Sequence, residues 1–301
     1  MKKHKINKRI LIALSFLLPA KVRSRLAFKR NHGYEPDLNN PQTFCEKLLW
    51  RKFNEKNDLG SELFPHYSNK FDVKRIVHSL APELYIAKVL WRGGKISQEI
   101  IESMPNQFII KDTAGCGVFI VDDKAKIDID ALCLDMNRAA HLKYGVWGHE
   151  YWYSRTKNTL MIEEYLHDLH DSGGLIDYKF HCFHRADGGF IFFLQVDKGR
   201  FSIHRRNWYD SEFKKMPYRT TIFENFDDSL FDLISEKHLR EMLEIAKKLS
   251  RPFSYARIDL YYTDMPVLGE ITFGHGGGFE KMDQELDDLM GSCWDICLSN
   301  K

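Results

Sequence analysis

The segment 255–273 strongly limits what this chain can fold into, because its pattern predicts a β-hairpin. Two runs rich in β-branched and aromatic residues flank a short loop, 263–266, which is the signature of two antiparallel strands joined by a tight turn. We expect the loop to close with Tyr262 opposite Val267. This register places two carboxylates directly opposite each other across the ladder.

The two carboxylates belong to Asp259 and Glu270, and they need a compensating group. Alternation along the strands puts Arg257, Asp259, Glu270 and Thr272 on one face. Like charges that face each other destabilise a ladder. A magnesium ion offsets such repulsion, because it takes oxygen ligands and is usually held by one or two carboxylates together with substrate phosphates. The alternative is a solvated sheet face on which Arg257 neutralises Asp259, and the pattern alone leaves both interpretations open.

Length and composition indicate a globular protein without a disulfide framework. With 301 residues, 44% of them hydrophobic, the chain can bury one large core or two lobes of ordinary size. No internal repeat or low-complexity tract separates such lobes, so we expect them to pack against each other. Six cysteines at irregular spacings fit a reducing compartment, and we therefore expect a cytoplasmic protein.

The basic charge of the chain is concentrated at its N-terminus. The first 34 residues contain ten Lys and Arg and no acidic residue, which leaves 34 basic against 42 acidic residues in the remainder. This distribution argues against nucleic acid as a partner, because a nucleic-acid-binding body carries its basic residues over a working face. The apolar run 10–18 is too short to span a bilayer. Two interpretations remain: a basic amphipathic helix lying on the anionic inner face of the membrane, or a helix docked on the body with its basic side in water.

Hydrophobic periodicity predicts an α+β protein with a helical N-terminal segment followed by two lobes. Thr43, with Glu46 three residues later, is a capping-box signal for a helix. The predicted helices cover 44–54, 70–79, 128–143 and 235–250, and the predicted strands cover 84–91, 107–111, 118–121, 160–166, 176–184 and 189–197. The predicted regions are a basic helical segment at 1–65, a first lobe at 66–166, and a second lobe with the hairpin at 167–301.

The loop 112–117 is suited to an anion. It connects strand to strand, and Gly115 and Gly117 allow backbone N–H groups to approach an anion closely, beside the charge of Lys111. A plain hairpin turn with a surface lysine is the alternative interpretation.

Further basic groups lie in the second lobe. On strand 176–184, Asp177 and Lys179 share a face, and a lysine directed into a lobe interface needs an anionic partner such as phosphate. A solvent-facing edge strand is the alternative. Arg200 and the run 204–207 form a basic cluster, and arginine forks bind carboxylate or phosphate through paired hydrogen bonds. The glycine-rich run 274–280 either admits a substrate closely or acts as a hinge.

Short motifs occur in a fixed order along the chain. They are Asn40-Pro-Gln-Thr-Phe-Cys-Glu-Lys-Leu48, Asn69-Lys-Phe-Asp-Val-Lys-Arg75, Pro105-Asn-Gln-Phe-Ile-Ile-Lys111, Ile162-Glu-Glu-Tyr-Leu166, Asp177-Tyr-Lys-Phe180, Arg200 with His204-Arg-Arg-Asn207, Arg257-Ile-Asp259 and Gly269-Glu-Ile-Thr272. In this order they resemble the TupA-like family of ATP-grasp proteins, which is associated with teichuronopeptide biosynthesis. The resemblance runs from residue 40 to residue 280.

The resemblance implies the ATP-grasp fold, in which two αβ lobes clamp a nucleotide. Lys70 and Lys111 would reach the phosphates or the adenine, and the segment 163–166 would read the adenine edge. Lys179 and Arg205 would contact the γ-phosphate or an acyl phosphate, and Arg257 would hold the acyl-acceptor region. The residues implied are Lys70, Lys111, Gly115, Gly117, Glu163, Glu164, Leu166 and Asp177 for ATP; Asp259, Glu270 and Thr272 for Mg²⁺; and Lys179, Arg205 and Arg257 for catalysis.

The same resemblance implies an ADP-forming carboxylate–amine ligase that uses ATP and Mg²⁺ to modify a sugar acid in cell-surface polysaccharide biosynthesis. Its partners would be a small-molecule or glycan carboxylate and an amine. Two alternatives stay open. One is a glycosyltransferase that uses a nucleotide sugar, with Asp259 and Glu270 on its metal. The other is an inactive binding module, which Asp112 beside the phosphates and Thr272 in the place of an asparagine would favour.

Overall fold

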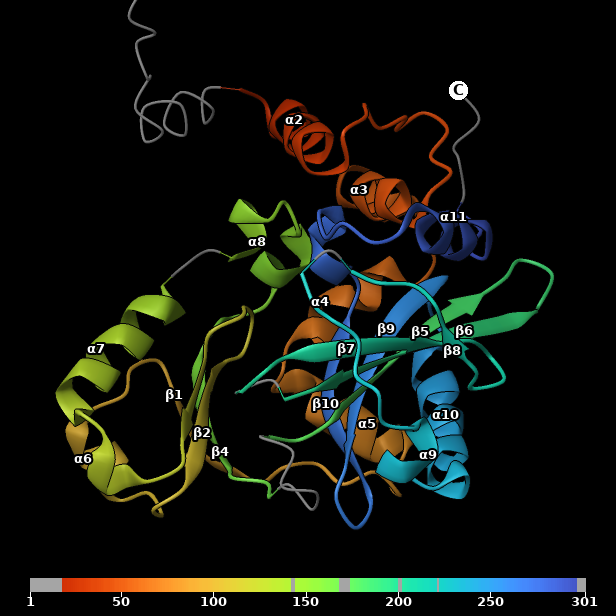
Figure 1. Ribbon diagram of the computed structural model, residues 1–301. Coiled ribbons are helices and arrows are strands. Elements are labelled where there is room, and N and C mark those ends of the chain that lie inside the picture. Colours follow the sequence, from red (N-terminus) through yellow and green to blue (C-terminus); the bar gives the residue numbers. More distant parts are fainter. Residues whose placement is uncertain (1–17, 142–143, 168–173, 200–201, 221, 297–301) are drawn as a thin grey trace, which may run out of the picture.

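The computed structural model describes residues 18–141, 144–167, 174–199, 202–220 and 222–296. Two antiparallel sheets lie side by side, with helices on their outer faces and at one end (Figure 1). The helices are α2 (Ala20–His32), α3 (Phe44–Asn54), α4 (Phe64–Ser68), α5 (Asp72–Leu80), α6 (Gln98–Glu102), α7 (Ile129–Ala140), α8 (Tyr144–Trp147), α9 (Leu230–Leu233), α10 (Glu236–Ser250) and α11 (Gln284–Ser292), with 3₁₀ turns η1 (Glu55–Asn57), η2 (Ser61–Leu63), η3 (Lys124–Lys126), η4 (Tyr151–Arg155) and η5 (His275–Gly278). The strands are β1 (Val89–Gly93), β2 (Phe108–Asp112), β3 (Val118–Val121), β4 (Leu160–Glu164), β5 (Asp177–His184), β6 (Phe190–Lys198), β7 (Arg205–Tyr209), β8 (Lys215–Met216), β9 (Tyr255–Tyr262) and β10 (Pro266–Thr272).

The first sheet has the strand order β1–β4–β2–β3 and packs one face against α6 and α7. Phe108 and Ile110 of β2 join Leu132 and Met136 of α7 in this core. Because side chains alternate along a strand, Lys111 points to the opposite face, toward the second sheet.

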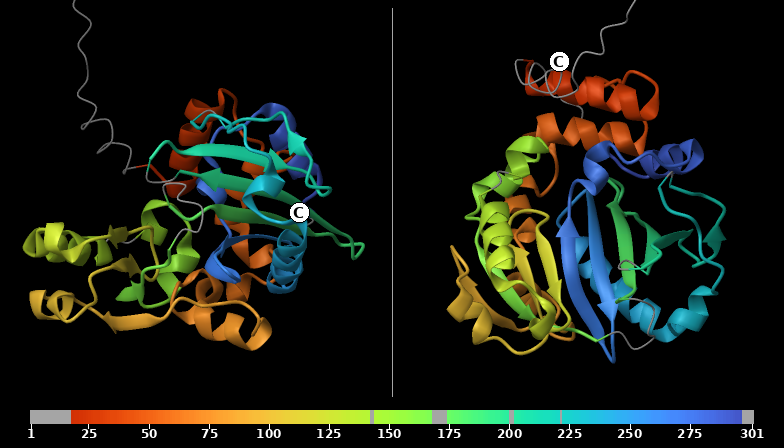
Figure 2. Two further views of the ribbon diagram at one scale, coloured as in Figure 1. Left: turned by 60° about the horizontal axis from the view of Figure 1, so that its bottom comes forward. Right: turned by 60° about the vertical axis from the view of Figure 1, so that its left-hand side comes forward.

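The second sheet has the strand order β10–β9–β5–β6–β7–β8 and is covered on both faces. One face packs against α5 and α10 through residues such as Phe180 and Ile258. Part of the other face packs against α3 and α11, where Phe44 and Trp294 cover Tyr255. The rest of that face carries charged side chains that line a cavity shared with the first sheet. The right-hand view of Figure 2 shows the strands of the two sheets next to each other.

Helices α4 and α5 belong to the core of the second sheet, although the sequence places them in the first lobe. Phe64 of α4 stacks on Phe273 with ring centroids 4.0 Å apart, and Val73 and Val77 of α5 lie in the same core. The core of the first sheet contains no residue before Leu90 among the described residues. The hydrophobic cores therefore change from the second sheet to the first after α5.

The predicted hairpin forms with a different register near its loop. Tyr262 pairs with Pro266, so the expected pairing with Val267 is wrong. A β-bulge at Gly269 absorbs the one-residue difference, and Asp259 still pairs with Glu270. Glycine suits this position because a Cβ atom would lie 2.8 Å from the carbonyl oxygen of Asp259.

At the N-terminus, the described residues begin with Leu18, so the apolar run 10–18 lies almost wholly outside them. The capping box of α3 is confirmed: Glu46 N donates to Thr43 Oγ1 (3.2 Å), and Thr43 N donates to Glu46 Oε2 (3.3 Å). Among the described residues, no helix is long and apolar enough to cross a membrane.

Candidate active site

A cavity of about 420 Å³ lies between the two sheets. This volume is within the range of small-molecule and cofactor sites. Eight of the site residues predicted from the sequence line this cavity: Lys70, Lys111, Glu163, Glu164, Leu166, Asp177, Asp259 and Glu270. The cavity therefore brings together residues that are far apart in the chain.

On the first-sheet wall, Glu163 lies between two lysines. Lys111 Nζ is 2.6 Å from Glu163 Oε2, and Lys74 Nζ is 2.5 Å from Glu163 Oε1. Burial alone would raise the pKa of Glu163, but Lys111 and Lys74 outweigh burial and lower it. Sequence reasoning missed Lys74, although it lies in the same short motif as Lys70.

Glu164, the next residue on β4, points to a different set of partners. Its Oε1 accepts hydrogen bonds from Tyr85 Oη (2.5 Å) and from the backbone N–H of Lys88 (2.7 Å). The carboxylate thereby fixes the segment before β1, and Tyr165 and Leu166 follow it along the cavity wall.

The side chain of Asp112 supports the glycine loop 112–117 through a hydrogen bond to its backbone. It shares the core side of β2 with Phe108 and Ile110, opposite to Lys111. Its Oδ1 accepts from the backbone N–H of Gly117 (3.1 Å), and burial raises its pKa. Lys70 Nζ lies 3.9 Å from Asp112 Oδ1 and donates to the carbonyl oxygen of Gly115. The carboxylate of Asp112 is thus directed to the core side of β2 and supports the backbone of the loop, although its Oδ1 stays close to Lys70.

On the second-sheet wall, Lys179 lies between two aspartates. Its Nζ donates to Asp177 Oδ1 (3.0 Å) and to Asp259 Oδ2 (2.7 Å). Burial alone would lower the pKa of Lys179, but Asp177 and Asp259 outweigh burial and raise it, so the ammonium stays charged. Strand β5 is a central strand and Lys179 is only 6% exposed, which excludes the alternative of a solvent-facing edge.

Arg257 contacts the other three groups that share the predicted face of the hairpin. Its Nε and Nη2 donate to the two carboxylate oxygens of Asp259 (2.7 and 2.8 Å). Nη2 also lies 3.0 Å from Glu270 Oε1 and 3.3 Å from Thr272 Oγ1. Burial alone would lower the pKa of Arg257, but Asp259 and then Glu270 outweigh it and raise the pKa. Arg257 does neutralise Asp259, as in the second interpretation, but Arg257, Asp259 and Thr272 are buried, and only the side chain of Glu270 keeps a large exposed fraction (39%) among these four residues.

The donor set at this face suits a hard divalent cation. Asp259, Glu270 and Thr272 offer only oxygen atoms, the ligand type that Mg²⁺ prefers. Asp259 Oδ2 already accepts from both Lys179 and Arg257, whereas Oδ1 accepts from Arg257 Nε and retains a lone pair for a second partner. The residues present therefore fit a magnesium ion.

The structure does not bring Arg205 to the cavity. Arg205 Nη1 donates to the carbonyl oxygen of Asn225 (3.2 Å), on the other face of β7. The adjacent Arg206 points inward, is 6% exposed, and binds Asp197 (Nε–Oδ1, 2.5 Å) and Glu280. The sequence identified the basic cluster but not which of its arginines faces inward. Arg200 lies outside the described residues.

The glycine-rich run after Thr272 packs against its surroundings instead of forming an open hinge. Gly276, Gly277 and Gly278 have positive φ angles, and a Cβ atom on Gly278 would lie 3.0 Å from the carbonyl oxygen of Cys45 in α3. His275 Nδ1 accepts from Arg257 Nη1 (2.7 Å), a contact that sequence reasoning missed.

Glu150 is a second group near the cavity that sequence reasoning missed. Its carboxylate rests against Gly274, where a Cβ atom would collide with Oε1. Burial raises its pKa to about 7, and Lys52, Tyr144 and Arg257 offset part of that effect. No motif marks Glu150, so only the tertiary structure reveals it.

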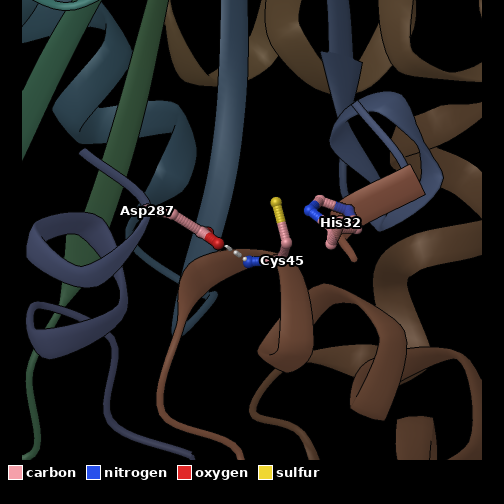
Figure 3. A group of neighbouring side chains, drawn as sticks. All are labelled: His32, Cys45 and Asp287. Atoms are coloured by element: carbon pink, nitrogen blue, oxygen red, sulfur yellow. Dashed lines mark hydrogen bonds between the residues drawn. The ribbon is translucent and has the colours of Figure 1, made fainter. Parts of the chain in front are cut away.

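A cluster of potential metal ligands also lies outside the cavity (Figure 3). His32, Cys45 and Asp287 come within 4.8 Å of one another. Cys45 N donates to Asp287 Oδ1 (2.8 Å), and His32 Nε2 donates to the carbonyl oxygen of Gly278 (3.1 Å). Burial raises the pKa of the Cys45 thiol well above its usual range, which disfavours the thiolate that a metal needs. We interpret the cluster as a hydrogen-bonded junction of α2, α3, α11 and the glycine run.

Comparisons with solved structures give matches of low sequence identity and low TM-score. D-alanine–D-alanine ligase from Helicobacter pylori is 15% identical and has a TM-score of 0.42, with 77% of this chain and 60% of that chain covered. The ATP complex of D-alanine–D-alanine ligase from Bacillus anthracis is 15% identical and has a TM-score of 0.37, with 71% and 56% covered. The macrocyclase MdnC from Microcystis aeruginosa, bound with its precursor peptide MdnA, is 11% identical and has a TM-score of 0.36, with 97% and 72% covered. This chain thus spans about 60% of the length of the first of these proteins.

The comparison with sequence families is more decisive. No curated protein matches the sequence significantly. The family described as TupA-like ATPgrasp matches residues 46–294, which include both sheets and every nominated residue that lines the cavity. The chain therefore belongs to the TupA-like ATP-grasp family.

Proposed function

We propose that this protein is an ATP- and Mg²⁺-dependent carboxylate–amine ligase that modifies a sugar acid in cell-surface polysaccharide biosynthesis, and that it works in the cytoplasm. One observation carries the proposal. The cavity between the sheets has Lys70 and Lys111 on one wall and Asp259 and Glu270 on the other. A triphosphate between these walls would meet ammonium groups on one side and carboxylates that hold its metal on the other.

The reaction would proceed in two steps. A carboxylate oxygen of the acid substrate attacks the γ-phosphorus of ATP. The bond between the γ-phosphorus and the bridging oxygen of the β-phosphate breaks, and ADP and an acyl phosphate form. The amine then attacks the acyl carbon, inorganic phosphate leaves, and the amine loses a proton. When bound, Mg²⁺ would neutralise phosphate charge and orient the phosphates.

The residues of this chain would supply position and charge. Asp259, Glu270 and the hydroxyl of Thr272 would hold the metal. Lys179, the cation between Asp177 and Asp259, would meet the transferred phosphate. Arg257 orients Asp259 and donates toward Glu270, and a guanidinium at this place would also stabilise negative charge that develops on the acyl group. The sugar-acid substrate class rests on the family to which the chain belongs.

The decisive experiment measures ADP release from Mg·ATP over a matrix of uronic acids and amines. We expect one or more pairs to stimulate ADP release, and Glu270→Gln to lower kcat/KM by about 100-fold or more, since preorganised charge stabilisation is of that size. Glu212→Gln, a change at an exposed carboxylate in the β7–β8 connection, is the matched control and should leave turnover unchanged. Turnover that survives Glu270→Gln would refute the metal assignment.

The two alternatives give different results in the same assay. A glycosyltransferase would release a nucleoside diphosphate from a nucleotide sugar without ATP. An inactive module would release no ADP with any pair, and failure to bind Mg·ATP in a thermal-shift assay would favour it.

A further inference from the structure

The outer face of α2 presents aliphatic side chains to solvent. Leu18, Val22 and Leu26 are 39%, 41% and 52% exposed. Residues four positions apart on a helix lie on one face, so Val22 and Leu26 lie together on α2, and Leu18 is an exposed aliphatic residue just before the N-cap Pro19. We call these three residues the stripe. A row of exposed aliphatic residues on one helix differs from the scattered single exposures that are normal on a protein surface.

Basic side chains surround this stripe. Lys21, Arg25, Lys29 and Arg30 are all exposed. The acidic residue near them is Glu35, which lies 2.9 Å from Arg25 and 3.6 Å from Lys29 in exposed ion pairs that solvent weakens. The seventeen residues before Leu18, which lie outside the described part, contribute five more Lys and Arg to the same end of the chain.

The inner face of α2 is fixed to the body, so the stripe cannot turn inward without breaking these contacts. Ser24 and Phe28 are buried, and Ser24 Oγ is 2.7 Å from His149 Nδ1. Asn31 and His32 bind the carbonyl oxygens of Phe279 and Gly278 (3.4 and 3.1 Å). Helix α2 lies at one end of the molecule, beyond α3 and away from the two sheets that form the cavity (Figures 1 and 2).

We propose that the outer face of α2 docks on an anionic lipid surface, with Leu18, Val22 and Leu26 inserted at the interface and the surrounding lysines and arginines on the phosphate groups. An interfacial helix combines these two features, an apolar stripe and basic flanks. Nucleic acid would engage the cations but would leave the aliphatic stripe in water. This inference does not depend on the ligase function.

The test measures co-sedimentation of the full-length protein with vesicles of mixed phosphatidylcholine and phosphatidylglycerol, and with vesicles of phosphatidylcholine alone, at about 0.1 M salt. We expect binding to the mixed vesicles only. The variant Val22→Glu/Leu26→Glu removes the stripe, and the variant Lys21→Glu/Arg30→Glu reverses two flanking charges. Each should lower the vesicle partition coefficient by more than about tenfold, because it places carboxylates against an anionic surface.

Matched controls carry the same types of change elsewhere. Leu134→Glu on α7 alters an aliphatic residue of similar exposure (51%), and Lys237→Glu on α10 reverses an exposed charge. Both should bind vesicles like the unaltered protein, and all variants should keep their thermal midpoint. Equal binding of the α2 variants and the unaltered protein would overturn the proposal. If the charge variant lost vesicle binding and the aliphatic variant kept it, the insertion of the stripe would be overturned. If the protein bound duplex DNA, and both variants weakened that binding as they weaken vesicle binding, the lipid assignment would be overturned.

Discussion

Arg257 holds both carboxylate oxygens of Asp259, a residue two positions further along the same strand, at 2.7 and 2.8 Å. The two side chains are almost fully buried, and Lys179 reaches Asp259 from the neighbouring strand. A carboxylate fixed from two directions has little rotational freedom, so its remaining ligand capacity points in a defined direction before any metal arrives.

The first prediction concerns the ion pair between Arg257 and Asp259. Arg257→Met should lower the free energy of unfolding by about 3 kcal/mol, because it removes one partner of a buried pair and leaves the carboxylates short of positive charge. Adding Asp259→Asn to Arg257→Met should recover part of this loss. Urea denaturation at pH 7 measures both changes. A double variant no more stable than Arg257→Met would contradict the coupling between the two residues.

The second prediction concerns Glu163. Glu163→Gln should destabilise the protein by about 3 kcal/mol at pH 7, because Lys74 and Lys111 then share no acid. The pKa of Glu163 is lowered in the folded state, so its stabilisation is present above the unfolded value of about 4.5 and is lost as the pH falls through the folded value. Denaturation at several pH values should therefore show the variant and the unaltered protein converging in acid. Glu164→Gln, a change at the partner of Tyr85, is the matched control and should cost about 1 kcal/mol.

The third prediction concerns the glycine loop. A Cβ atom on Gly115 would collide with the Asp112 carboxylate that accepts from Gly117 N. Gly115→Ala should therefore weaken Mg·ATP binding by about tenfold, corresponding to ~1.4 kcal/mol, as measured by titration calorimetry. Gly94→Ala is the matched control, because a Cβ atom there would have no neighbour within 4 Å. Equal affinities of the two variants for Mg·ATP would show that the hydrogen bond between Asp112 and Gly117 does not shape the nucleotide site.

The fourth prediction uses the titration of Glu150. Burial raises its pKa from 4.5 to about 7, so the folded protein binds more protons than the unfolded chain between these values. The free energy of unfolding should consequently fall as the pH rises through this window, by up to about 3 kcal/mol. Glu150→Gln cannot titrate and should remove this part of the pH dependence in thermal denaturation. A variant with the unaltered pH profile would contradict the raised pKa.

Local signals in the sequence predicted local structure well. The Thr43 and Glu46 capping box correctly gives the first residue of α3, because both of its hydrogen bonds lie within one helical turn. Strand alternation correctly placed Arg257, Asp259, Glu270 and Thr272 on one face. These inferences need only the period of an element and the residues within it.

The features that the sequence did not reveal depend on partners far along the chain. Arg205 and Arg206 look alike in the sequence, and only the pairing of Arg206 with Asp197 on β6 turns Arg206 inward. The direction of the Asp112 side chain depends on which side of β2 packs against α7, and the sequence did not show that packing. Glu150 carries no motif at all, and its burial comes from contacts with the glycine run over a hundred residues later.

The bulge at Gly269 separates the acid pair from the turn. Asp259 and Glu270 can face each other across a longer turn with a continuous ladder, or across a shorter turn with one unpaired residue, and this chain has the second arrangement. Strand twist added by such an insertion is concentrated next to the cavity, between the acids and the loop. The short turn and the unpaired residue therefore align the two acids only together: loss of the bulge without an extra residue in the turn would move Glu270 opposite Ile258 and onto the other face of the sheet.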